Sequence, residues 1–174
     1  MENSTAEELQ HRAEYTMSRF EEYKDRERVF PAAIETLKLV HRCGIKTAFV
    51  TSKSAPELAL FLNRFPAADA VDTMVCASDV VHPKPHPESA LLACERLGVS
   101  PEHAFLVGDS IYDLRCAKAA GCTPIAVAYG STPLPTLASE DPAALFETPE
   151  DLLAWTEQGL LQATCPERKF QTRS

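Results

Sequence analysis

Short β-type runs alternate with helix-like segments along most of this sequence, and this alternation restricts the fold to a few architectures. The helix-like segments carry apolar residues at helical spacing, and several of them end at glycine. A parallel pair of strands needs a crossover connection, which is usually a helix. The sequence therefore predicts an α/β fold, a Rossmann-like parallel sheet with helices on both faces. The four expected strands lie within 45–52, 72–79, 104–109 and 123–130.

Composition excludes several classes of protein. The 174 residues, 45% of them hydrophobic, suit one globular domain with a substantial core. A formal net charge of −8 argues against binding to the nucleic-acid backbone, and no apolar run approaches the roughly 20 residues needed to cross a bilayer. Six cysteines without a C-x-x-C pair, behind a polar and acidic amino terminus, indicate a reducing cytoplasm rather than secretion. We therefore expect neither a nucleic-acid nor a membrane partner.

Polar residues follow the expected strands, where the carboxyl ends of a parallel sheet usually bind ligands. Thr51 and Ser52 end the first run, and their hydroxyls can hold an anion together with backbone N–H groups. Hydroxyl residues also commonly end strands or cap helices, so this signal alone is weak. Lys84 follows the second run between Pro83 and Pro85, which restrict the backbone and present the ammonium from a stiff loop.

Two histidines flank that lysine. His82 and His86 have a spacing that suits a metal site, but no third ligand of suitable type is expected nearby in sequence. Histidines in exposed loops are common without a metal. We therefore expect no metal site at these histidines.

The third strand exit carries two carboxylates. Gly108 permits a tight turn, Asp109 leaves the strand, and Asp113 falls in the first turn of the following helix. Two carboxylates at one exit repel each other unless a cation or a helix dipole compensates for their charge. The alternative is that Asp109 caps the helix and Asp113 interacts with the helix dipole.

Taken together, the three exits resemble a known family. The ordered set FVTS, KPHP and VGDSIYD, followed by AKAAG, looks like the second, third and fourth motifs of the haloacid dehalogenase superfamily. The phosphoglycolate phosphatase-like branch is the most similar. The resemblance covers residues 30–129, and the acidic third exit is of the phosphatase type.

The resemblance implies a Mg²⁺-dependent phosphomonoester hydrolase that works through an aspartyl-phosphate, acting on a small phosphorylated metabolite. By motif, Asp109 would be a metal ligand and Asp113 a ligand or an anchor behind it. Thr51 and Ser52 would bind the phosphate. Lys84 would also contact the phosphate and would neutralise charge near the nucleophile, as the catalytic residue of this set. Phosphoryl transfer depends mostly on positioning and charge neutralisation, which suits these residue types.

One departure from the family pattern concerns the nucleophile. The family places it in a D-x-D-G-T motif after the first strand, and this sequence contains no D-x-D. Residues 1–29 resemble the end of a helical cap, 30–160 an incomplete haloacid dehalogenase-like core, and 161–174 a polar tail. The first strand and most of the cap are thus expected to be missing. In the family's strand order the missing strand is central, which would leave two strands with unpaired edges.

Several alternatives follow from this departure. The two halves of the sheet could close directly on each other, another polypeptide could supply the strand, or the chain could be the shortened product of a longer gene; the undamaged motifs favour the last. We therefore expect a phosphatase that is inactive as this chain. The alternatives are a non-catalytic module or partner subunit that binds phosphate and Mg²⁺, and a non-functional gene remnant. Self-association, or complementation by the missing amino-terminal segment, is expected at the open sheet.

Overall fold

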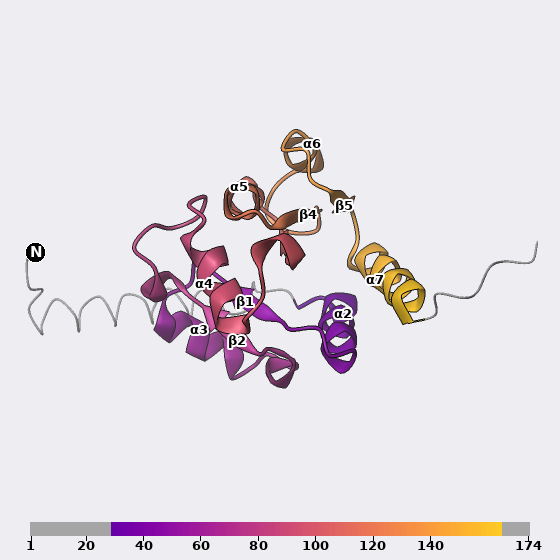
Figure 1. The fold of residues 1–174 in the computed structure, drawn as a ribbon, viewed down its shortest axis with the longest axis horizontal. Coiled ribbons are helices and arrows are strands. Elements are labelled where there is room, and N and C mark those ends of the chain that lie inside the picture. Colours follow the sequence, from indigo (N-terminus) through magenta and orange to yellow (C-terminus); the bar gives the residue numbers. More distant parts are fainter. Residues whose placement is uncertain (1–28, 165–174) are drawn as a thin grey trace, which may run out of the picture.

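A computed structural model describes residues 29–164, in which parallel strands and helices alternate along the chain (Figure 1). Most of the expected cap remnant, 1–29, and of the expected tail, 161–174, lies outside these residues. The strands are β1 (Ala48–Val50), β2 (Thr73–Val75), β3 (Phe105–Gly108), β4 (Thr123–Val127) and β5 (Ala144–Phe146). The α-helices are α2 (Pro31–Arg42), α3 (Ala55–Leu62), α4 (Glu88–Leu97), α5 (Ile111–Ala120), α6 (Leu134–Ala138) and α7 (Pro149–Thr164). Short 3-10 turns are η2 (Ala68–Ala70), η3 (Ala77–Asp79) and η4 (Pro101–His103).

The strands form two separate parallel sheets. One sheet pairs β1 with β2, and the other has the order β3-β4-β5. The predicted α/β fold with parallel strands is confirmed, and all four expected strands are present. Among the described residues β1 does not pair with β3, so the alternative in which the two halves of the sheet close directly on each other is wrong.

Two helices connect the sheets. Helix α4 packs against β1 and β2, α5 packs against β3 and β4, and α4 and α5 pack against each other. Their contact is built from small side chains, which allow two helices to approach closely. The buried cluster at this contact comprises Ala90, Cys94, Cys116, Ala117, Ala120 and Cys122. Four described cysteines are buried free thiols and act as small apolar residues.

The second sheet exposes one face of β3. Phe105 and Val107 are 63% and 48% exposed, whereas Leu106 points the other way and packs on the cluster between α4 and α5. Side chains alternate between the two faces of a strand, so the exposed pair lies on one face. Apolar side chains of a strand normally lie under a neighbouring element. The face of β3 that carries Phe105 and Val107 is therefore only partly covered by the described chain.

Two elements were not expected from the sequence. Strand β5 has only three residues, too few for a periodic pattern to stand out. Helix α6 lies in a proline cluster that reads as a loop, but a proline occupies its first turn, where the missing N–H costs nothing. In the described part of the chain, no helix is long and apolar enough to cross a membrane.

Candidate active site

A cavity of about 460 Å³ lies at the carboxyl ends of β1 and β3. Its wall includes residues from the ends of both strands, which belong to different sheets. The structure brings all five sequence-predicted site residues to this one cavity. The lining residues are Val50, Thr51, Ser52, Lys84, Val107, Gly108, Asp109, Ser110, Tyr112, Asp113 and Ser131.

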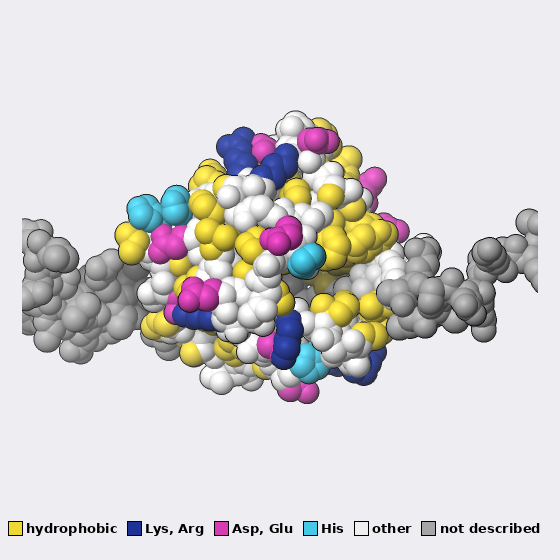
Figure 2. Space-filling view, viewed as in Figure 1, with side chains coloured by type: hydrophobic (Ala, Val, Ile, Leu, Met, Phe, Trp, Pro, Cys, Tyr) yellow, Lys and Arg dark blue, Asp and Glu magenta, His cyan; other side chains and the backbone are white. Residues whose placement is uncertain are grey.

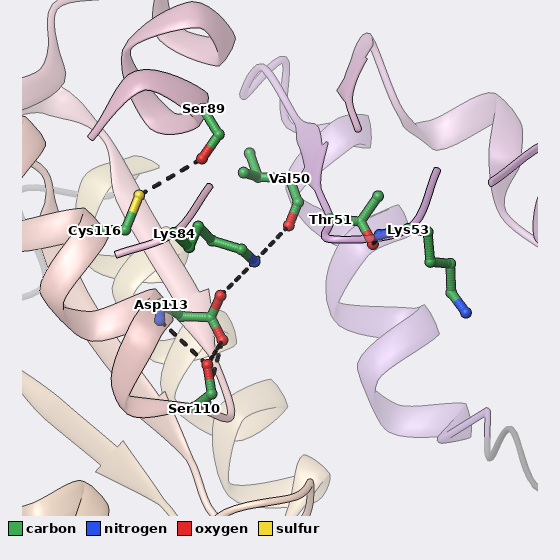
Figure 3. Close-up of polar contacts among 8 residues, drawn as sticks. All are labelled: Val50, Thr51, Lys53, Lys84, Ser89, Ser110, Asp113 and Cys116. Atoms are coloured by element: carbon green, nitrogen blue, oxygen red, sulfur yellow. Dashed lines mark hydrogen bonds and ion pairs between the residues drawn. The ribbon is translucent and has the colours of Figure 1, made fainter. Parts of the chain in front are cut away.

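Lys84 links the two sides of the cavity (Figure 3). Its Nζ donates to the carbonyl oxygen of Val50, the last residue of β1, at 3.2 Å. The same atom pairs with Asp113 Oδ1 at 2.6 Å, and the two side chains are only 13% and 10% exposed. In such a setting a short ion pair is screened much less than a surface pair. Lys84 therefore joins β1 of the first sheet to the first turn of α5.

Asp113 is anchored by the start of α5. Its Oδ2 accepts hydrogen bonds from the Ser110 hydroxyl at 2.5 Å and from the Ser110 N–H at 3.2 Å, while Ser110 Oγ accepts the Asp113 N–H at 3.2 Å. This reciprocal capping box identifies Ser110 as the N-cap. The alternative in which Asp109 caps this helix is therefore wrong. Both carboxylate oxygens of Asp113 have partners.

Gly108 allows Asp113 to lie where it does. A Cβ atom added at Gly108 would overlap the Cβ and carboxyl carbon of Asp113. Gly130 has the same relation to Asp109, because an added Cβ would overlap that side chain too. Both carboxylates thus pack directly against glycine backbone. The two positions require glycine for close approach, and neither has a positive φ.

Asp109 differs from Asp113 in the hydrogen bonds that its two carboxylate oxygens accept. Its Oδ2 accepts the N–H of Ser131 at 2.6 Å, whereas within residues 29–164 its Oδ1 accepts no hydrogen bond. Burial, followed by the negative charge of Asp109, raises the pKa of the Tyr129 phenol to about 12. A half-buried carboxylate with an open oxygen fits a hard cation such as Mg²⁺, which prefers oxygen ligands and takes one or two protein carboxylates.

Thr51 and Ser52 form the opposite wall. The Thr51 N–H continues the β1–β2 pairing by donating to the Val75 carbonyl at 2.9 Å, and its Oγ1 accepts the Lys53 N–H at 3.1 Å. The threonine hydroxyl proton can still be donated to a bound anion, because a hydroxyl both accepts and donates. Ser52 is exposed at the same edge.

Sequence reasoning missed several residues of the site. Ser110 carries a usable signal, since a serine three residues before an acidic residue is the capping-box pattern. Ser131 reaches Asp109 from 22 positions away, and nothing in its local sequence indicates this contact.

The expectation that no third ligand lies near His82 and His86 was wrong, because the carboxylate of Glu88 meets both rings on the outside of the loop.

The chain is similar in sequence to known hydrolases. The family model for haloacid dehalogenase-like hydrolases matches residues 1–127. The phosphoglycolate phosphatase of Salmonella paratyphi A is 36% identical over 125 residues, which are 72% of this chain and 50% of that protein. The chain thus spans about half the length of the curated relatives that it matches.

Solved structures show the same arrangement of elements. The structure of a predicted phosphoglycolate phosphatase from Haemophilus somnus aligns with a TM-score of 0.71 and 26% identity, over 89% of this chain and 69% of that one. A hydrolase from Pseudomonas syringae has a TM-score of 0.74 at 22% identity, over 90% of this chain and 71% of that one, and supports the fold alone.

Proposed function

The chain belongs to the haloacid dehalogenase-like hydrolases, and from that premise we propose that its cavity is the phosphate- and Mg²⁺-binding part of a phosphatase site. The substrate class is a small phosphorylated metabolite, with phosphoglycolate as the first candidate because the similar Salmonella enzyme is a phosphoglycolate phosphatase. The observation that carries the proposal is the convergence of Thr51, Lys84 and Asp109 on one cavity.

The proposed roles follow from what each side chain touches. Thr51 and Ser52 donate to the phosphate oxygens from the β1 side of the cavity, and the Lys84 ammonium neutralises the phosphate charge from between the sheets. Asp109 would hold Mg²⁺ through its open oxygen. Asp113, whose two oxygens already have partners, keeps Lys84 in place. When bound, Mg²⁺ would supply charge neutralisation at the phosphate.

We expect no catalysis from this chain alone. The sequence has no D-x-D motif, which is the motif that carries the nucleophile in the resemblance described above. Without an attacking group the covalent route is closed. We therefore expect the 174-residue chain to bind phosphate and Mg²⁺ and not to turn over.

Ligand-induced stabilisation tests the binding part of this proposal. With Mg²⁺ or orthovanadate at about 100 times its dissociation constant, the free energy of unfolding should rise by about 2.7 kcal/mol for each bound ligand. Thr51→Val should reduce the vanadate effect, and Asp109→Asn should remove the part that depends on Mg²⁺. Thr136→Val, in α6 and outside the cavity, is the matched control and should respond as the unmodified chain does.

Thermal unfolding with each ligand alone and with both provides the measurement. An equal shift in all four proteins would place the bound ions outside the cavity and reject the assignment. Hydrolysis of p-nitrophenyl phosphate in the presence of Mg²⁺ should stay at background. Turnover that disappears in Asp109→Asn would show that this chain has a complete catalytic mechanism and would overturn the proposed division of roles.

We also propose that a further parallel strand occupies the space between β1 and β3. Among the described residues each of these strands pairs on one side only, and the cavity opens between them. An unpaired edge is a template for another strand. The favoured occupant is the strand that carries the nucleophile in the resemblance described above, because in that pattern this strand lies at the centre of the sheet.

Without that segment, the open edges and the exposed Phe105 and Val107 should cause concentration-dependent self-association. Light scattering after size-exclusion chromatography measures this. Val107→Lys should shift the population toward monomer, and Leu91→Lys, at a similarly exposed position on α4, should not. A monomer at all concentrations would contradict the open-edge proposal.

The proposed compartment is a reducing cytoplasm, supported by the five described cysteines, all of which are free thiols.

A further inference from the structure

A second group of potential metal ligands lies on the outside of the loop that carries Lys84. The ring centroids of His82 and His86 are 4.5 Å apart, and Figure 2 shows a pair of adjacent histidine side chains at the surface. Glu88 Oε2 lies 2.8 Å from His82 Nδ1 and 3.8 Å from His86 Nδ1. One ligand atom from each of the three residues falls within 4.8 Å of the other two.

The carboxylate of this group is held in place by the backbone. Glu88 Oε1 accepts the N–H of Val81 at 2.8 Å, and its Oε2 accepts the N–H of His82 at 3.0 Å. Hydrogen bonds that orient a ligand in this way reduce the rearrangement that metal binding needs. Glu88 is therefore positioned before any ion arrives.

The loop backbone is also restricted. Prolines occupy positions 83, 85 and 87, alternating with His82, Lys84, His86 and Glu88. Each proline fixes its own φ and limits the residue before it. Lys84 reaches inward to Val50 and Asp113, while the two histidine side chains are exposed to solvent. The loop thus has a polar inner side and a separate outer group of ligands.

We propose that His82, His86 and Glu88 form a binding site for a transition-metal dication of the Zn²⁺ type, on the outer side of the loop whose inner residue enters the cavity. Two imidazoles and one carboxylate suit Zn²⁺, which then keeps an open position for water. Mg²⁺ prefers oxygen ligands, so this site and the carboxylates of the cavity select different ions.

Binding requires only small movements. Zn²⁺ bond lengths of about 2.0–2.2 Å in tetrahedral geometry place ligand atoms about 3.4 Å apart, close to the separations found here. In the structure His86 Nδ1 accepts a hydrogen bond from the Glu88 N–H at 3.3 Å. This long hydrogen bond would be lost when the ring rotates toward the metal. The other ring nitrogen of each histidine remains available as an alternative ligand.

Titration of the metal-free chain with Zn²⁺, followed by NMR of the histidine rings, tests the site. At one equivalent the resonances of His82 and His86 should shift together, and that of the exposed His103 should not. His82→Ala, His86→Ala and Glu88→Gln should each weaken the affinity by at least about 10-fold, the lower end of what loss of a supporting group costs a metal site. His103→Ala is the matched control and should leave the affinity unchanged.

The exposed thiol of Cys43 offers Zn²⁺ another ligand, and Cys43→Ser distinguishes the two sites. Unchanged affinity in Cys43→Ser supports the histidine site. Loss of binding in Cys43→Ser, an affinity in the three ligand variants equal to that of the unmodified chain, or no Zn²⁺ binding would each overturn the proposal. Thermal unfolding of every variant in EDTA verifies that the fold is kept. These outcomes do not depend on the phosphatase proposal, because they are read from Zn²⁺ binding and not from phosphate.

Discussion

Asp113→Asn should lower the free energy of unfolding by about 3 kcal/mol, because removal of one member of a buried ion pair leaves the other charge uncompensated. The Asp113 side chain is 10% exposed, and its carboxylate lies 2.6 Å from the ammonium of Lys84. The amide cannot neutralise that ammonium, and it weakens the capping box with Ser110. Urea or thermal unfolding measures the loss.

A second ion pair of the same length tests whether burial, rather than distance, determines the cost of removing one partner. Glu140 forms an ion pair with Arg115 at the same 2.6 Å, but the arginine side chain is 52% exposed. Glu140→Gln should therefore cost no more than about 1 kcal/mol, as surface pairs do. Lys84→Met combined with Asp113→Asn should recover part of the loss, because no unpaired charge then remains. Equal costs at the two sites would show that the Lys84 pair is screened like a surface pair.

Gly108→Ala should lower the free energy of unfolding by about 2 kcal/mol, because the added methyl group overlaps Asp113 and overpacking a tight site costs this much. The displaced carboxylate also releases Lys84, so stabilisation by orthovanadate should fall in the same variant. Gly130→Ala should instead displace Asp109 and reduce the response to Mg²⁺. Thermal unfolding with each ion separates the two effects.

Helix α7 supplies the control for both substitutions. Nothing lies within 4 Å of a Cβ added at Gly159, which is exposed in the helix. Gly159→Ala should raise the free energy of unfolding by about 1 kcal/mol, because alanine favours a helix over glycine. If Gly108→Ala were as well tolerated as Gly159→Ala, the close packing of Asp113 on the β3 backbone would have to be rejected.

Sequence reasoning succeeded where local patterns decide the structure. The strand runs and the polar residues that follow them are local features, and parallel strands bring their carboxyl ends to one edge. These local features predict that Thr51, Lys84 and Asp109 meet, as they do at the cavity. The contact of Ser131 with Asp109 could not be predicted in this way, because this contact depends on where the loop after β4 passes.

Other features depend on packing that no local pattern encodes. The separation of the sheets reflects which strand edges meet in space, and β5 is too short to have a period. Glu88 was overlooked as a ligand because it reads as the first residue of a helix. Its side chain instead turns back over the proline-rich loop to the N–H groups of Val81 and His82.

The position of Lys84 couples the proposed binding of phosphate to the contact between β1 and the first turn of α5. Its ammonium already contacts the Val50 carbonyl on one side and Asp113 on the other. In the proposed site a bound phosphate would share that charge, so phosphate binding would change the strength of the contact that holds β1 near α5. By reciprocity, this contact would change the affinity for phosphate by the same factor by which bound phosphate changes the contact.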